Sequence, residues 1–250
     1  MATDLTPSPR RTAASRAGEL AAAVAGEVFG QMLGAVGALR RAKPLHPRGT
    51  VHAATLERAG LARDGAGSSR RGGVPLTDEA GRDEGHVRIS RAVGLPEPLP
   101  DILGAAVRLP GRDGTVDLLF ATTGVGILTR YVLLPRRDAH APMTTLMPLR
   151  TPSGPLQLRL TPVPSPTPSA TREWEMSASS PGSRRWEPFA RLVASTDPVG
   201  PDSDPPLRFD PVGNIPAGTS QYPWIARVRD PAYVLARRRA PLNGRARPGS

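Results

Sequence analysis

The chain has 250 residues, with 33 lysines and arginines against 22 aspartates and glutamates, which gives a net charge of +11. It contains no cysteine, which excludes disulfides, thiol catalysis and cysteine-ligated metals and fits a reducing compartment. The 30 prolines and 26 glycines predict many turns, but a hydrophobic fraction of 38% excludes full disorder. The length suffices for one large domain or two small ones with a real core.

The positive charge comes almost entirely from arginine, because Lys43 is the only lysine. Arginine pairs with carboxylates through two parallel hydrogen bonds, so this composition suits an acidic ligand. It also attracts polyanions without specificity, and residues 227–250 contain seven arginines and only one aspartate. The sequence shows no known nucleic-acid fold motif, so we expect no specific nucleic-acid partner.

The N-terminal region predicts a loose start and a long helix. Residues 1–11 are polar and rich in proline, which predicts disorder. Apolar residues then recur at steps of three or four from Leu20 to Leu39, which predicts an amphipathic helix over about 12–41. We expect this helix to pack on the protein or on a partner; binding to a membrane surface is the alternative. No signal peptide or membrane-spanning segment is predicted, so the expected location is the cytoplasm.

The middle of the chain predicts many short strands separated by turns, which favours an antiparallel barrel or sandwich. Residues 111–114, Gly-Arg-Asp-Gly, predict a hairpin. The expected strands are 50–58, 87–93, 102–109, 116–122, 156–163, 171–178, 188–195 and a last short one at 207–209. Between them, 60–82 predicts a loop, 127–134 a short helix or strand, and 139–149 a helical segment. Asp101 is expected to cap a turn, and His86 and His140 to lie at the surface.

A second helix is predicted near the end of the chain, with Asp230 as N-cap and Pro231 in its first turn. Arg229, Tyr233 and Arg237 follow one another at steps of four, so they share a face of that helix. Arginines beside a phenol lower its pKa, and a phenolate can ligate iron, as in tyrosine-ligated haem. The alternative is an amphipathic helix with the tyrosine packed at its edge.

Several segments, taken in order, resemble the haem-catalase superfamily. His-Pro-Arg-Gly at 46–49 resembles the segment that carries the distal histidine. Val-Arg-Ile-Ser at 87–90 and the Asp-Ile-Leu-Gly run at 101–108 resemble two of its strands. Phe-Asp-Pro at 209–211 and Arg-x-x-x-Tyr at 229–233 resemble the proximal region. The chain looks most like minimal catalase-related proteins of actinobacteria, some of which are labelled phosphodiesterases, although nothing here resembles a phosphodiesterase metal centre.

This resemblance implies a mainly β (α+β) fold: a catalase-like antiparallel barrel of about eight strands with an N-terminal and a C-terminal helix. The regions it implies are a disordered start at 1–11, a helix at 12–42, the barrel at 43–212, a segment and helix at 213–240, and a basic tail at 241–250.

The resemblance also implies haem b as a cofactor. Tyr233 would ligate the iron, with Arg229 and Arg237 beside it. Arg88, on a strand expected to face inward, would bind a haem propionate. An eight-stranded barrel can hold one such ligand.

On the distal side, His46 would move a proton between the two oxygens of a peroxide, and Ser90 would support that pocket. The asparagine of catalases falls near Thr122 or Ala121 here, and the phenylalanine that stacks near the haem has no match at 124–127.

Three hypotheses therefore remain open. The first is a haem protein with weak peroxidase or other peroxide-linked oxidoreductase activity. The second is a barrel without haem that binds an apolar acid or a partner protein. The third is association with polyanions through arginine.

Overall fold

The computed structural model describes residues 48–61, 73–92, 94–96, 98–137, 140–165, 169–200 and 207–222. Its elements, in chain order, are β1 (Arg48–Arg58), α2 (Pro75–Asp78), β2 (Gly81–Arg91), β3 (Leu103–Gly111), β4 (Gly114–Thr122), the 3-10 helix η1 (Thr129–Tyr131), β5 (Met143–Thr144), β6 (Leu149–Thr151), β7 (Gly154–Pro162), β8 (Thr171–Ser179) and β9 (Glu187–Pro198).

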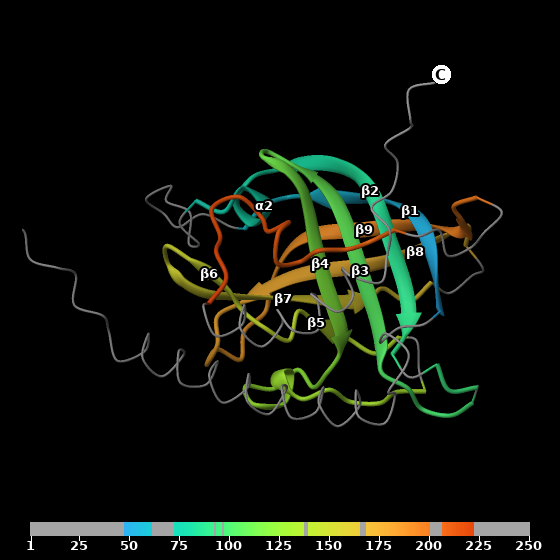
Figure 1. The fold of residues 1–250 in the computed structure, drawn as a ribbon. Helices are drawn as coiled ribbons and strands as arrows, with labels where there is room; N and C mark the ends of the chain where they lie inside the picture. The colour runs from blue at the N-terminus through green and yellow to red at the C-terminus, as the bar shows by residue number, and fades with distance from the viewer. Residues whose placement is uncertain are drawn as a thin grey trace, which may run out of the picture.

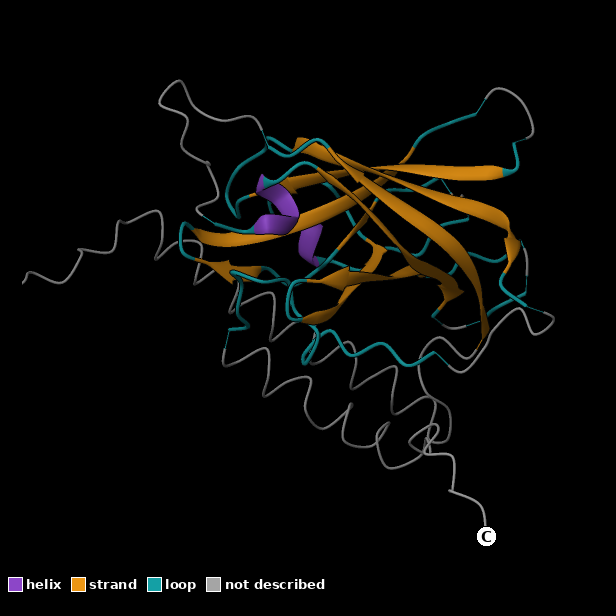
Figure 2. Cartoon of the chain, turned by 90° about the horizontal axis from the view of Figure 1, so that it is seen from above, coloured by secondary structure: helices purple, strands orange, loops and turns teal. Residues whose placement is uncertain are grey.

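Eight of the nine described strands form a closed antiparallel barrel (Figure 1). The pairing runs from β5 through β4, β3, β2, β1, β9, β8 and β7, and the short β5 closes the ring by pairing with both β4 and β7. β6 lies outside the ring: it pairs with β7 as a small hairpin, and its Arg150 also forms a single antiparallel bridge with Ser220. Figure 2 shows the strands crossing at an angle as the sheet curls around the interior. The predicted barrel is therefore confirmed.

Strict alternation along the strands builds the interior. On β3, Val107 and Leu109 are buried and pair with Leu118 and Val116 of β4. The other long strands contribute Leu, Met, Phe and Trp side chains to the same cluster. Since successive side chains point to opposite faces of a strand, the residues between them lie on the outside of the barrel. The fold thus rests on one continuous apolar core.

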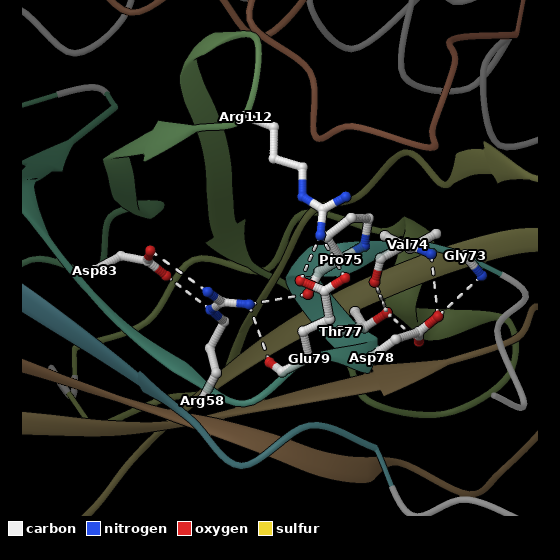
Figure 3. Close-up of polar contacts among 9 residues, drawn as sticks. All are labelled: Arg58, Gly73, Val74, Pro75, Thr77, Asp78, Glu79, Asp83 and Arg112. Carbon is white, nitrogen blue, oxygen red and sulfur yellow. Dashed lines mark hydrogen bonds and ion pairs between the residues drawn. The ribbon is translucent and has the colours of Figure 1, made fainter. Parts of the chain in front are cut away.

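One end of the barrel is closed by the segment around α2 (Figures 1 and 3). Leu61 and Val74 join the core there. Arg58, at the end of β1, donates to Asp83 at 2.7 Å and to the carbonyl oxygens of Pro75 and Glu79 at 2.9 and 3.0 Å. These bonds satisfy the guanidinium at a site where its side chain is only 13% exposed. They hold the helix across the barrel end.

α2 itself lasts a single turn. Pro75 occupies its first turn, where the missing N–H costs nothing. The Asp78 carboxylate accepts hydrogen bonds from the backbone N–H groups of Gly73 and Val74, both at 3.0 Å (Figure 3). A carboxylate in the first turn also faces the positive end of the helix. The predicted loop at 60–82 was wrong here, because one turn is too short to show a helical period.

Two further expectations are corrected. The described part of the expected helical segment, 140–149, is not helical: prolines 142 and 148 interrupt it, and it contains β5 and the first residue of β6. The segment 207–209 is no strand; the Arg208 carbonyl accepts a hydrogen bond from the Arg108 side chain instead of from a neighbouring strand. For 127–134, the structure takes one of the two expected forms, the 3-10 helix η1.

The strap, residues 207–222, crosses the outside of β3 and β4. Its anchor is Asp117, which is 2% exposed. The carboxylate accepts from Arg108 Nε at 2.8 Å, from the Asp210 N–H at 2.7 Å and from Asn214 Nδ2 at 2.7 Å. Arg108 also lies over the Phe209 ring, 4.9 Å from its centroid. One buried carboxylate therefore ties the strap to the barrel wall.

Candidate ligand-binding site

The barrel end opposite α2 opens into a cavity of about 1050 Å³. In an antiparallel barrel the start of one strand lies beside the end of the next. The lining residues come from the start of β1, β3, β5 and β8 and from the end of β2 and β7, so they lie at the same end. This mouth, as we call it, is at the upper limit of the size range typical of small-molecule sites.

Apolar side chains form the inner wall of the mouth. Ile89, Leu103, Met143 and Trp174 line it, each from a different strand. Trp174 is only 6% exposed, and Met143 only 4%, so they present an already packed surface. A pre-formed apolar wall of this kind favours the apolar body of a ligand.

Arginines dominate the charge at the mouth. Arg91, Arg137, Arg172 and Arg191 line it, against the single carboxylate of Glu173. Arg191 is ion-paired with that glutamate. Arg137 and Arg172 are exposed, and no carboxylate pairs with either of them in the part of the chain that the structure describes. The rim therefore carries two guanidinium groups that can accept an anionic partner.

Arg91 is fixed at the edge of this site. Its Nε lies 3.6 Å from Asp101 Oδ2, and its Nη2 donates to the Leu99 carbonyl at 2.8 Å. Asp101, buried at 1% exposure, also accepts from the N–H groups of Gly94 and Leu95 at 2.7 and 3.0 Å. Asp101 has the structural role that was expected, but it holds the backbone at 94–95 rather than capping a turn. The carboxylate orders the loop before β3 and orients Arg91.

Below the apolar wall lies a polar pair on β1. Thr50 lines the mouth, and His52, one layer deeper, is 3% exposed. Thr50 pairs across the ladder with Ile89, and His52 pairs with the core residue Val87, so both side chains face inward. His52 Nε2 lies 2.9 Å from Thr50 Oγ1. The imidazole is the polar group closest to the core at this end of β1.

The three described residues that the catalase resemblance assigned to a haem site are separated. Ser90 lines the mouth, but Arg88 does not. Arg88 alternates with the core residues Val87 and Ile89, so it lies on the outer face of β2, and the expectation that it faces inward was wrong.

Thr122 is fully buried. Its hydroxyl donates to the Leu134 carbonyl at 2.8 Å and accepts from the Leu103 N–H at 3.2 Å. These two backbone bonds hold the start of β3 against the end of β4.

The other predicted site residues lie outside the described residues. They are His46, Arg229, Tyr233 and Arg237, together with the N-terminal and C-terminal helices. Within the described ranges, no group of three or more His, Asp or Glu side chains is placed to hold a metal ion.

A second cationic cluster lies on the outer face of β7 and β8. Arg130 is fully buried and donates to the carbonyl oxygens of Gly126 at 3.1 Å and Ser183 at 2.5 Å. Its guanidinium and that of Arg159 both lie over the Trp186 ring, at 4.6 and 4.8 Å from the centroid. Burial lowers the pKa of both arginines. The carbonyl acceptors and the aromatic ring stabilise the positive charge of these arginines. We therefore assign this cluster a structural role.

Most of the residues that line the mouth were not predicted from the sequence. Alternation along 50–58 places His52 on the same face as Ala54 and Leu56, and this signal could have identified it as inward-facing. Arg137 and Arg172 belong to segments that meet only when the ring closes, so no local pattern marks them.

A comparison of the sequence with protein-family models and with curated proteins finds no match. In the described part of the chain, no helix has both the length and the apolar character needed to cross a membrane.

Proposed function

We propose that the chain binds an apolar carboxylic acid in the mouth of its barrel. The observation that carries this proposal is the arrangement of unpaired Arg137 and Arg172 above a wall of Ile89, Leu103 and Trp174, within the described residues. An apolar acid matches this arrangement, because its carboxylate can meet the arginines while its hydrocarbon chain lies against the apolar wall.

The two parts contribute differently to binding. The apolar wall removes hydrocarbon from water, which is worth about 25 cal/mol per Å². The arginines add charge-assisted hydrogen bonds to the carboxylate, each worth about 1.5–3 kcal/mol. Because these arginines are exposed, salt screens their charge. We therefore expect them to contribute more to the orientation of the ligand than to its affinity.

Calorimetric titration of the full chain with palmitic acid tests the proposal. We expect binding to palmitic acid and weaker binding to palmityl alcohol, which has the same chain without the charge. Arg137→Gln combined with Arg172→Gln should reduce the affinity for the acid by about tenfold or more and leave the alcohol unaffected.

Arg112→Gln is the matched control, because Arg112 lies in the β3–β4 turn and pairs with Glu79 near α2. It should bind palmitic acid like the unaltered chain. If the acid and the alcohol bind equally, or if Arg112→Gln weakens binding as much as the rim variant, the proposal is wrong.

Haem is the second candidate ligand, since it is an apolar ring with two carboxylates and the rim has two arginines without a carboxylate partner in the described residues. The described lining suits the ring and the propionates. Haem bound here would supply iron redox chemistry with peroxides, in line with the weak peroxidase activity that the catalase resemblance implies. The assigned iron ligand Tyr233 and distal base His46 lie outside the described residues.

The visible spectrum of the chain mixed with haemin distinguishes the candidates. Haem ligated by Tyr233 predicts a Soret band that is lost in Tyr233→Phe. A chain that binds palmitic acid but gives no Soret shift with haemin is a barrel for apolar acids without haem.

A further inference from the structure

The pair Thr50 and His52 gives the inner end of the mouth a preference for a ligand that accepts a hydrogen bond. His52 Nε2 contacts the Thr50 hydroxyl at 2.9 Å, and His52 Nδ1 is buried with no hydrogen-bond partner in the described structure. A neutral imidazole carries one proton, on one nitrogen or the other. Which nitrogen carries it decides what Thr50 can offer a ligand.

The proton belongs on Nε2. With the proton on Nδ1, a buried N–H would lack an acceptor, whereas with the proton on Nε2 only a lone pair is unmatched. Orphaned buried N–H groups are rarer in proteins than under-satisfied acceptors. His52 therefore donates to Thr50, and the single hydroxyl proton of Thr50 is left to donate elsewhere.

The remaining hydroxyl proton of Thr50 can be donated only toward the mouth. Its side chain is half-buried, lines the mouth and faces inward beside Ile89. The wall around it is apolar, so an acceptor on the ligand would meet little competition there. The rim arginines are already assigned to the carboxylate, which makes this a second polar contact.

We propose that Thr50 donates a hydrogen bond to a ketone oxygen in the body of the bound acid, with His52 as the positioning residue that makes Thr50 a donor. This inference rests on the proposed function and narrows its ligand class from apolar acids to oxo acids.

Titration of the full chain with palmitic acid and a series of oxopalmitic acids, which differ in the position of the ketone, tests it. We expect one isomer to bind about five- to tenfold more tightly than palmitic acid. Thr50→Val should abolish this preference, and Thr50→Ser should keep it.

His52→Leu should reduce the preference, and His52→Gln, whose amide can donate to Thr50, should restore it. Thermal unfolding of each variant separates a loss of folding from a loss of preference; if a variant fails to fold, the isomer series on the unaltered chain and on Thr50→Ser still decides. Equal binding of all isomers and palmitic acid overturns this inference alone. Failure of palmitic acid to bind overturns the proposed function as well.

Discussion

At the scale of single residues, the most unusual group outside the mouth is the Tyr131 hydroxyl. Tyr131 is 7% exposed, and its hydroxyl is buried without a hydrogen-bond partner in the described structure. Leaving such a group unmatched costs about 1–3 kcal/mol. The ring fills space in the core, but the oxygen destabilises the fold.

Tyr131→Phe should therefore raise the free energy of unfolding by about 1 kcal/mol at neutral pH, since it keeps the ring and removes the unmatched oxygen. Denaturation in urea measures this value. Tyr131→Leu, which removes the ring as well, should lower stability. A loss of stability in the Phe variant would show that the hydroxyl has a partner.

The same residue predicts a pH dependence. Burial raises the pKa of Tyr131 above its usual value of 10.0, and the neighbouring Tyr222 acts in the same direction, while Arg130 opposes them. In the unfolded chain the phenol loses its proton first as the pH rises. Stability should thus be complete below about pH 10 and fall above it, as the pH passes through the raised pKa. Tyr131→Phe should flatten this fall; an unchanged alkaline profile would contradict the assignment.

At the scale of elements, the close approach of β2 to the backbone of β3 depends on Gly85. A Cβ atom at this position would lie 2.0 Å from the Arg108 carbonyl oxygen on β3. Because this neighbour is backbone, it cannot turn aside. Gly85→Ala should destabilise the fold by about 2 kcal/mol or more, as overpacking does. Ala53→Gly, at an exposed position of β1, should cost only about 0.5–1 kcal/mol. Equal losses in thermal unfolding would exclude this close approach.

The strap makes a second prediction at this scale. Asp117→Asn removes the charge that holds Arg108 and two groups of the strap, so it should lower the free energy of unfolding by about 3–5 kcal/mol. Glu57→Gln disrupts an equally short ion pair, with Arg82, that is half exposed, and should cost at most about 1 kcal/mol. Chemical denaturation compares the two, and similar losses would mean that Asp117 is no anchor.

These elements also show what the sequence could predict. Alternation and turn residues located seven of the strands, since a half-buried strand must alternate and a hairpin such as 111–114 needs its glycines. The closing strand β5 has two residues and leaves no period to detect. The mouth needs that closure, because it brings Met143 beside Trp174 and Ile89 from distant segments. The prediction for Arg88 failed because it followed the resemblance, whereas the alternation with Val87 and Ile89 places Arg88 on the outer face of the strand.

At the scale of the whole molecule, the barrel has one end closed by α2 and packed side chains and one end open and cationic. The net charge of +11 places anions near its surface in general, but only the mouth joins unpaired arginines to an apolar wall in the described structure. This asymmetry is the reason to expect a ligand there. We therefore expect the acid to enter the mouth and its hydrocarbon chain to lie against Trp174.

Quenching of tryptophan fluorescence by bromopalmitic acid tests that place most directly, because bromine quenches only at short range. Trp174 lines the mouth, while Trp186 lies between Arg130 and Arg159 on the outer face. The chain has a third tryptophan, Trp224, so the measurement is made with Trp224→Phe in every variant. We predict strong quenching in this background and when Trp186→Phe is added, and its loss when Trp174→Phe is added. Quenching that persists in Trp174→Phe, or that disappears in Trp186→Phe, would place the acid elsewhere and contradict the account.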